Sequence, residues 1–414
     1  MNVGIVTTWF ERGAAYVSKQ YQQAISQGHN VFIYARGGES YAIGQTNWDH
    51  NNVTWGKKPI NPVNTAINLK DFRNWIMNNS IEVVIFNEQN WWRPVEMCKD
   101  IGVKVGSYID YYTEETIPLF NLYDFLLCNT KRHYEAFKWH PQCYYIPWGT
   151  DIELYKPKLD QRKHINSDSS LVYFHSCGHN PSRKGTSEII KAFTMLENSN
   201  SKIIIHSQVN LNNFYPDLKI EIENLIDKGR LEIIYETVPA PGLYHLGDVY
   251  IYPSYLDGIG LTVAEALASG LPVITSNNAP MNEFVIDGMN GKLIDIERFF
   301  ARSDGYYWPQ CKVSQESLLN TIKYFEENKH KIDIYKENSR AFAVKELDWQ
   351  LNSKKILEIL PTIKLRKKEE WLDTIKLIKK YEYKRFPLQK YPKTLIIATF
   401  ISRTIKKIRE KWIK

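Results

Sequence analysis

The clearest structural pattern in the chain lies at residues 250–294, which read YIYPSYLDGIGLTVAEALASGLPVITSNNAPMNEFVIDGMNGKLI. The apolar run 249–252 predicts a buried strand that ends in a loop at Pro253. Small and apolar side chains recur at helical spacing through residues 261–269, and Gly270 ends that helix. Residues 272–275 predict a second buried strand. The stretch is therefore a strand–helix–strand crossover of a parallel sheet, and its first loop lies at the edge where such sheets bind ligands.

The loop of this crossover is suited to an anion. Gly258 and Gly260 let the backbone approach a ligand closely, and the unpaired amides of the first helical turn attract a phosphate. The carboxylates of Asp257 and Glu265 flank this helix end, because a helical side chain leans back toward the amino terminus. A structural alternative is a capping box of Thr262 and Glu265, in which Glu265 only binds a backbone amide, with Asp257-Gly258 as an ordinary turn. The residues alone leave both interpretations open.

The same stretch resembles the signature of the retaining GT-B glycosyltransferases of family four, in the form found in bacterial surface-polysaccharide synthesis. The resemblance rests on Tyr252-Pro-Ser, Asp257-Gly-Ile-Gly-Leu, the run from Ala264 to Ile274, and Asn290-Gly. That family has two glutamates separated by seven residues, and this chain has aspartate at the first place. The resemblance implies an α/β fold with two Rossmann-like domains facing across a cleft. It also implies transfer of a sugar, with retention, from a nucleotide diphosphate sugar to an acceptor hydroxyl.

A second loop of the donor half carries two cations. Residues 178–185 read GHNPSRKG and lead into a helix predicted at 187–196. In the family this loop places an arginine and a lysine on the donor diphosphate. Lys184 and Gly185 match, whereas His179 stands in the arginine's place and Arg183 is expected to supply part of the missing charge. The alternative for Arg183 and Lys184 is a solvated loop.

The resemblance implies a role for each of these residues. Glu265 would hold the ribose, Asp257 and the backbone of 258–260 the donor sugar, and Lys184 the phosphates; these three side chains are the catalytic candidates. The remaining donor-binding candidates are Arg183, Gly185, Gly258, Ile259, Gly260, Leu261, Thr262 and, in the loop expected to line the base, Val238. We expect no divalent metal and no cofactor beyond the nucleotide sugar, since no carboxylate or histidine cluster has ligand spacing.

The N-terminal half opens with a strand at 3–7, a loop, a helix from about residue 16 and a strand at 31–35, which is a βαβ unit. In the family the first loop helps to receive the acceptor, and Glu11, Arg12 and Gly13 occupy it here. Asp110 follows a strand predicted at 103–108, and Ile109 stands where the family usually has a histidine. Glu11, Arg12, Gly13 and Asp110 are therefore the acceptor-side candidates, with a plain turn of a buried βαβ unit as the alternative.

Length and composition indicate how many domains the chain has. With 414 residues, 43% of them hydrophobic, the chain predicts two domains plus extensions. We place them at 1–150 (acceptor side), 151–360 (donor side, with a helix returning to the first domain) and 361–414 (a basic helical tail). The first residues read as a strand and not a signal peptide, and five scattered cysteines indicate a reduced, cytoplasmic protein.

The basic charge is concentrated in the tail. Residues 361–414 contain 17 Lys and Arg against 5 Asp and Glu, whereas the whole chain has a net charge of +7. This distribution does not indicate a nucleic-acid partner. Five apolar residues of the tail fall on one helical face, namely Ile397, Ile401, Ile405, Ile408 and Trp412. The pattern predicts a helix lying on the inner face of an anionic membrane, near a glycan or lipid-linked acceptor; a helix packed on the protein is the alternative.

Two other functions fit the same pattern. A nucleotide-sugar epimerase or hydrolase of this fold would turn over the donor without an acceptor. A catalytically inactive subunit would bind the nucleotide sugar and turn over nothing. The fold does not separate these functions from glycosyl transfer, because activity resides in the site.

Overall fold

A computed structural model describes residues 1–60, 63, 65–158, 170–196, 199–391, 394, 397, 401 and 404. The chain divides into two compact units. Unit 1 comprises Met1–Asn129, His133–Ile146 and Ser353–Lys414, and unit 2 comprises Thr130–Arg132 and Pro147–Asn352. The polar run at 158–170, whose composition predicts a linker, lies outside the described residues except for its two ends.

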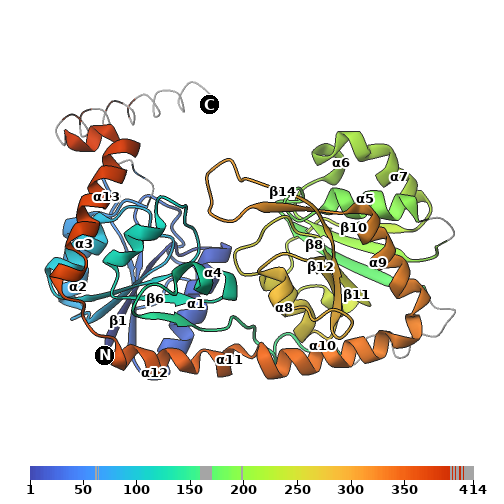
Figure 1. Ribbon diagram of the computed structural model, residues 1–414, viewed down its shortest axis with the longest axis horizontal. Helices are drawn as coiled ribbons and strands as arrows, with labels where there is room; N and C mark the ends of the chain where they lie inside the picture. Colours follow the sequence, from blue (N-terminus) through green and yellow to red (C-terminus); the bar gives the residue numbers. More distant parts are fainter. Residues whose placement is uncertain are drawn as a thin grey trace. The chain divides into compact units, whose positions relative to one another are not determined.

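Unit 1 is built on a seven-stranded parallel sheet in the order β3-β2-β1-β4-β5-β6-β7. The five inner strands of this sheet are mostly buried and rich in Val, Ile and Phe, as is typical of a parallel sheet covered on both faces by helices (Figure 1). The strands are β1 (Asn2–Thr7), β2 (Asn30–Ala35), β3 (Val53–Trp55), β4 (Val83–Phe86), β5 (Lys104–Tyr108), β6 (Phe125–Cys128) and β7 (Cys143–Tyr145). The helices are α1 (Gly13–Ile25), α2 (Leu69–Asn78), α3 (Arg93–Asp100), α4 (Lys131–Phe137), α12 (Lys354–Thr362) and α13 (Leu372–Arg385).

Unit 2 has a six-stranded parallel sheet in the order β10-β9-β8-β11-β12-β13 and a separate antiparallel pair, β14 and β15. The strands are β8 (Val172–Gly178), β9 (Lys202–Ser207), β10 (Leu231–Ile234), β11 (Val249–Tyr252), β12 (Val273–Ser276), β13 (Gly291–Ile294), β14 (Ile296–Phe300) and β15 (Gln310–Val313). The helices are α5 (Thr186–Met195), α6 (Leu211–Phe214), α7 (Lys219–Asp227), α8 (Leu261–Ala268), α9 (Gln315–Glu327), α10 (Ile332–Glu346) and α11 (Trp349–Asn352). Short 3₁₀ helices in the two units are η1 (Ile117–Leu122), η2 (Pro216–Leu218), η3 (Tyr244–Leu246), η4 (Met281–Glu283), η5 (Lys329–Lys331), η6 (Lys368–Glu370) and η7 (Pro387–Lys390).

The crossover predicted at 249–275 is confirmed as β11, α8 and β12. Helix α8 is apolar on most of its surface, and Val263, Ala264 and Leu267 are fully buried. They share a core with Ala343 and Leu347 of the α10 region. Packing on both sides explains why this helix is so rich in small residues.

Each sheet has one point where the strand order reverses. In unit 1 the chain runs outward from β1 to β2 and β3, and then returns to place β4 on the other side of β1. In unit 2 the corresponding reversal lies between β8 and β11. The loops that leave the two central strands diverge at such a point and leave a crevice at the carboxyl edge, which is where open parallel sheets bind ligands.

Among the strands that the sequence did not predict are β3 and the pair β14–β15. Strand β3 lies within residues 37–64, whose richness in Asn, Gly and Trp predicts an irregular segment; it is a three-residue edge strand that pairs with β2. The β14–β15 pair follows β13 directly and carries charged residues on its strands. Neither segment has a long apolar run, because neither is buried on both faces.

The segment that follows α12 is part of unit 1. Ile363, Arg366 and Trp371 are buried, and α13 buries Ile375 and Ile378. The predicted helix at 394–414 lies outside the described residues except for residues 394, 397, 401 and 404, which are helical. Of these, Ile397 and Ile401 are exposed. No helix in the described ranges is both long enough and apolar enough to cross a membrane.

Candidate active site

The strand-order reversal of unit 2 brings together two loops that lie far apart in the sequence. The loop after β8 ends at Gly185, and the loop after β11 begins at Pro253. Gly185 has a φ of 72°, and a Cβ there would overlap the carbonyl oxygen of Pro253. The amide of Tyr255 donates a hydrogen bond of 2.8 Å to the carbonyl of Arg183. Glycine is therefore required at 185 for the loops to meet.

At this meeting point Asp257 contacts both predicted cations. Its Oδ1 lies 3.0 Å from Nη1 of Arg183, and its Oδ2 lies 3.0 Å from Nζ of Lys184. The hydroxyl of Tyr252 accepts a hydrogen bond from Nζ of Lys184 and donates one to Oδ2 of Asp257. Lys184 and Asp257 are 13% and 15% exposed, so the cluster is shielded but open to a ligand. His179 lies exposed in the same loop. The second cation beside the carboxylate of Asp257 is Arg183.

The electrostatics of this cluster favour an anionic ligand. Burial lowers the pKa of Lys184 to about 8, although the charge of Asp257 opposes that shift. Burial also acts to raise the pKa of Asp257, but Lys184 and Arg183 outweigh it and hold the pKa below its usual value. Near neutral pH the cluster thus has two cations and one carboxylate, and its excess positive charge suits a phosphate.

The start of helix α8 adds backbone donors to the same loop. Gly260 precedes the helix with a φ of 84°, a left-handed conformation that favours glycine. Within the described residues no side chain caps this end of α8. The amides of Leu261 and Thr262 therefore remain available, and the positive end of the helix dipole adds to the attraction for an anion. Gly258 and Ile259 complete the loop between Asp257 and this helix end.

The alternative of a capping box at α8 is ruled out. Thr262 lies inside the helix, and Glu265 accepts a hydrogen bond of 2.6 Å from the hydroxyl of Tyr244, not from a backbone amide. Burial raises the pKa of Glu265 to about 7, despite the hydrogen bond from Tyr244 and the charge of Lys184. A partly buried carboxylate so placed is a ready acceptor for ligand hydroxyls. Val238 lies further away in sequence, partly exposed in the loop after β10.

The acceptor-side candidates occupy the carboxyl edge of the sheet in unit 1. Glu11 is exposed and accepts a hydrogen bond from the hydroxyl of Tyr16. Arg12 precedes α1, and its Nη2 lies 3.3 Å from Oε2 of Glu88. Gly13 begins α1, and a Cβ there would meet no atom of the described residues within 4 Å. Asp110 follows β5 and is partly exposed. Glu88 lies two residues after the end of β4 and was not among the predicted candidates.

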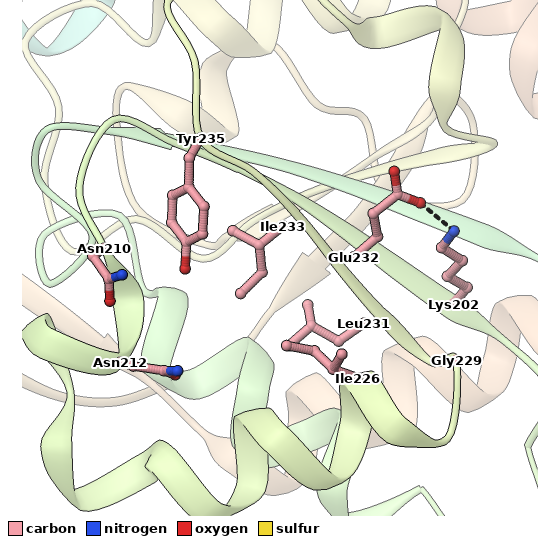
Figure 2. A pocket seen from close by; sticks show the side chains of 9 residues that line it. All are labelled: Lys202, Asn210, Asn212, Ile226, Gly229, Leu231, Glu232, Ile233 and Tyr235. Carbon is pink, nitrogen blue, oxygen red and sulfur yellow. Dashed lines mark hydrogen bonds and ion pairs between the residues drawn. The ribbon is translucent and has the colours of Figure 1, made fainter.

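A pocket of about 480 Å³ lies elsewhere in unit 2 (Figure 2). The side chains of Asn210, Asn212 and Tyr235 gather at one end, and the ion pair of Lys202 and Glu232 lies at the other. Its walls belong to the edge strand β10, the start of β9 and the α6–α7 region, and none of the predicted site residues lines it. Across the described residues, no group of three or more His, Cys, Asp or Glu side chains could hold a metal ion.

One family model matches part of unit 2. Residues 157–299 match the family model described as glycosyl transferases group 1, a stretch that includes Arg183, Lys184, Asp257 and Glu265. The chain is 26% identical over 157 residues to an uncharacterized glycosyltransferase of Methanocaldococcus jannaschii, covering 35% of this chain and 37% of that protein. It is 26% identical over 158 residues to a D-inositol 3-phosphate glycosyltransferase of an Arthrobacter species, covering 36% of this chain and 37% of that protein. The matches thus span about 37% of the length of these two curated relatives.

The solved structures extend the likeness over most of the chain. The Alr3699/HepE protein of Anabaena, solved in complex with UDP, superposes with a TM-score of 0.68 at 16% identity. The superposition covers 87% of this chain and 99% of that one. At this identity the likeness shows the fold. The predicted fold of two Rossmann-like units of the GT-B class is confirmed.

Proposed function

We propose that this chain is a retaining glycosyltransferase that moves a sugar from a nucleoside diphosphate sugar to an acceptor hydroxyl in the synthesis of a cell-surface glycan. The observation that carries the proposal is the cluster of Asp257, Arg183 and Lys184 beside the uncapped start of α8. It stands at the strand-order reversal of a parallel sheet, where a nucleotide is expected to bind. The family-model match over residues 157–299 supports the same reading.

The cluster supplies what departure of a nucleoside diphosphate requires. Negative charge builds on the phosphates as the bond to the sugar breaks, so donors that are already in place lower the barrier. Lys184, Arg183 and the amides at the start of α8 are such donors, and we propose that they make a divalent metal unnecessary. Asp257 holds the two cations together, and each of its oxygens can accept a further hydrogen bond from a donor-sugar hydroxyl. Glu265 would accept hydrogen bonds from the ribose.

Turnover of nucleotide sugars tests this proposal. A panel of uridine, guanosine, adenosine and thymidine diphosphate sugars is first screened for thermal stabilisation of the full chain. The stabilising donor is then incubated with a mixture of glycan acceptors, with and without EDTA, and nucleoside diphosphate release is measured. We expect release that requires an acceptor and persists in EDTA. Release without any acceptor would favour a hydrolase or epimerase, and binding without turnover would favour an inactive subunit.

The dependence of kcat/KM on pH provides a second prediction. Glu265, with a pKa of about 7, must be ionised to accept ribose hydroxyls, and Lys184, with a pKa of about 8, must be protonated to bind phosphate. Since kcat/KM reports the free enzyme, its profile for the nucleotide sugar should be a narrow bell that falls below pH 7 and above pH 8. Glu265→Gln should lower donor affinity and remove the acid limb without loss of thermal stability.

A matched control for this prediction is Glu188→Gln. Glu188 also accepts a hydrogen bond from a tyrosine hydroxyl, that of Tyr255, in the same unit. The control variant should keep the acid limb. If Glu265→Gln has wild-type kcat/KM over the whole pH range, Glu265 does not bind the donor.

We further propose that the basic tail holds the protein at an anionic membrane, where a lipid-linked acceptor would lie. Each cation near an anionic surface contributes about 1 kcal/mol. The full chain should sediment with vesicles containing phosphatidylglycerol, not with neutral vesicles, and salt should release it. Truncation after Lys390 should abolish binding, and this position leaves the buried residues of α13 intact. Equal sedimentation of the truncated protein would show that the tail is not the anchor.

A further inference from the structure

The parallel sheet of unit 2 has two edge strands, β13 and β10. At β13 the chain bonds its own edge: the amide of Leu293 donates to Oδ1 of Asp287 at 2.9 Å, and the amide of Gly288 donates to the carbonyl of Gly291 at 2.9 Å. Backbone groups left unpaired at an edge are a template for pairing with another strand, and folded proteins usually cover them. The edge at β13 is thus covered by its own chain.

Strand β10 is uncovered in the part of the chain that the structure describes. It pairs in parallel with β9, with Leu231 beside Ile203 and Ile233 beside Ile205. The carbonyl of Arg230 accepts a bond of 2.9 Å from the amide of Ile203, and the bonding direction alternates along a strand, so residues 231 and 233 turn their amides and carbonyls away from β9. Among the described residues, none hydrogen-bonds to the outward amide or carbonyl of Ile233.

Apolar side chains lie along the same edge. Ile226 of α7 and Tyr235, which follows β10, are 44% and 48% exposed. Together with Leu231 and Ile233 they line the pocket of about 480 Å³ (Figure 2). Because alternate residues of a strand share a face, the side chains of residues 231, 233 and 235 form one row beside the outward backbone groups. These four residues make up the β10 edge.

The β10 edge is complementary to a second copy of itself. Two copies of the strand can pair antiparallel about a two-fold axis at Ile233, since the amide and carbonyl of this residue then bond those of its counterpart. In this register Leu231 lies opposite Tyr235 of the other copy, so apolar side chains meet along the pocket face. At each end Arg230 lies opposite Glu236, a pair of opposite charges.

Neighbouring registers fit less well. An axis one residue earlier sets Glu232 opposite itself, and an axis one residue later sets Glu232 opposite Glu236. Like charges directly opposite each other destabilise a strand pair. An axis two residues earlier sets Ile233 opposite Gly229, which has no side chain to pack against it. Hydrogen bonding, apolar contact and charge therefore all favour the register about Ile233.

We propose that two copies of this chain associate through the β10 edge, with the two strands antiparallel about a two-fold axis at Ile233. The partner is a second copy and not another polypeptide, because the edge matches its own two-fold image in hydrogen bonding, apolar contact and charge. The six-stranded sheets of the two copies join into one continuous sheet. Tyr235 of the partner subunit then lies beside the pocket that Leu231 lines. The dimer does not depend on the proposed glycosyl transfer.

Ile233→Pro tests the strand pairing. Proline removes the outward amide of residue 233 and keeps the bonds of β10 to β9, which come from the even-numbered residues, so this edge position tolerates it. Sedimentation velocity of the wild-type full chain should show a dimer in the micromolar range. The proline variant should sediment as a monomer under the same conditions, while its thermal unfolding stays cooperative.

A charge on the same surface gives a second test that leaves the backbone of β10 intact. Ile226→Lys puts a cation into each pocket wall and should raise the Kd of the dimer at least about tenfold, because the charge loses water on association. The matched control is Ile286→Lys. Ile286 is also an exposed isoleucine of unit 2, at 47%, and lies in the loop before the opposite edge strand, β13. The control should leave the Kd of the dimer as in the wild type.

A single introduced cysteine tests the register. Residues directly opposite in a hydrogen-bonded antiparallel pair have Cα atoms about 5.5 Å apart, a separation that a disulfide can span. Oxidation of Ile233→Cys with copper phenanthroline should therefore link two chains on a non-reducing gel, above the level of the wild type with its native cysteines. Lys228→Cys is the control, because residue 228 is exposed but lies before β10 and far from its counterpart. It should not cross-link.

Three results would overturn the inference. A wild-type chain that stays monomeric throughout the micromolar range lacks the interface, even if an extended peptide binds the β10 edge. A dimer that persists in both Ile233→Pro and Ile226→Lys, or whose Ile233→Cys variant fails to cross-link, uses another surface. A dimer that is lost on truncation after Lys390 is held by the tail instead.

Discussion

Replacing Lys184 with alanine should lower kcat/KM for the nucleotide sugar roughly 10²–10³-fold, the loss typical of removing one donor that stabilises developing charge. The lysine is 13% exposed and shares Asp257 with Arg183, so no solvent cation can take its place as closely. Affinity for the nucleoside diphosphate should fall as well, because the same charge acts in the ground state. Initial rates and calorimetric titration with the nucleoside diphosphate measure the two effects.

The matched control is Lys336→Ala. Lys336 is also a shielded lysine of unit 2, 18% exposed, and its Nζ lies 3.0 Å from Oδ1 of the buried Asp248. Loss of this ion pair should change stability and leave nucleoside diphosphate affinity as it was. A Lys184→Ala protein that binds every nucleoside diphosphate as tightly as the wild type would remove Lys184 from the donor site.

Asp124→Asn should cause the largest loss of stability in unit 1. Asp124 is fully buried; it pairs with Lys99 and accepts hydrogen bonds of 2.9 and 2.8 Å from the amides of Val105 and Arg366. The carboxylate thus connects α3, β5 and the segment that leads to α13. Removing its charge leaves Lys99 buried without a counter-charge, which typically costs about 3–5 kcal/mol. Urea unfolding followed by tryptophan fluorescence measures the change.

Asp373→Asn is the control for this prediction. Asp373 pairs with Lys376 at 2.9 Å, but both side chains are exposed, at 89% and 77%. Such surface pairs contribute little, so the unfolding midpoint should not move. If Asp124→Asn unfolds at the same urea concentration as the wild type, the buried pair does not fasten the C-terminal segment to unit 1.

The sequence predicted the repeating units of the fold because their signals are local. A buried parallel strand is an apolar run, and α8 shows its packing in the spacing of small residues. The edge strand β3 and the β14–β15 pair have no such signal. The burial of Arg366 and Trp371 depends on contacts with residues more than 200 positions earlier in the chain, which no local pattern indicates.

The candidate site was predicted only in part, because the sequence shows local patterns and not the contacts between distant segments. The loops that carry Lys184 and Asp257 each have a recognisable pattern, whereas their meeting depends on β8 and β11 being neighbours in the sheet. The contact of Glu265 with Tyr244 and the ion pair of Glu88 with Arg12 also depend on the folded chain. The residues 262–265 allowed a helix cap at Thr262 as an alternative, and the start of α8 after Gly260 and the bond from Tyr244 to Glu265 rule it out.

The anomeric configuration of the first product tests the central claim most directly. The full chain is incubated with the stabilising nucleotide sugar and an octyl glycoside acceptor, and proton NMR follows the anomeric signals from the first minutes. We predict release of the nucleoside diphosphate together with a new glycoside that keeps the anomeric configuration of the donor, at a rate that Lys184→Ala lowers at least 100-fold. A product of inverted configuration, or a donor that stays intact with every acceptor offered, would contradict the account.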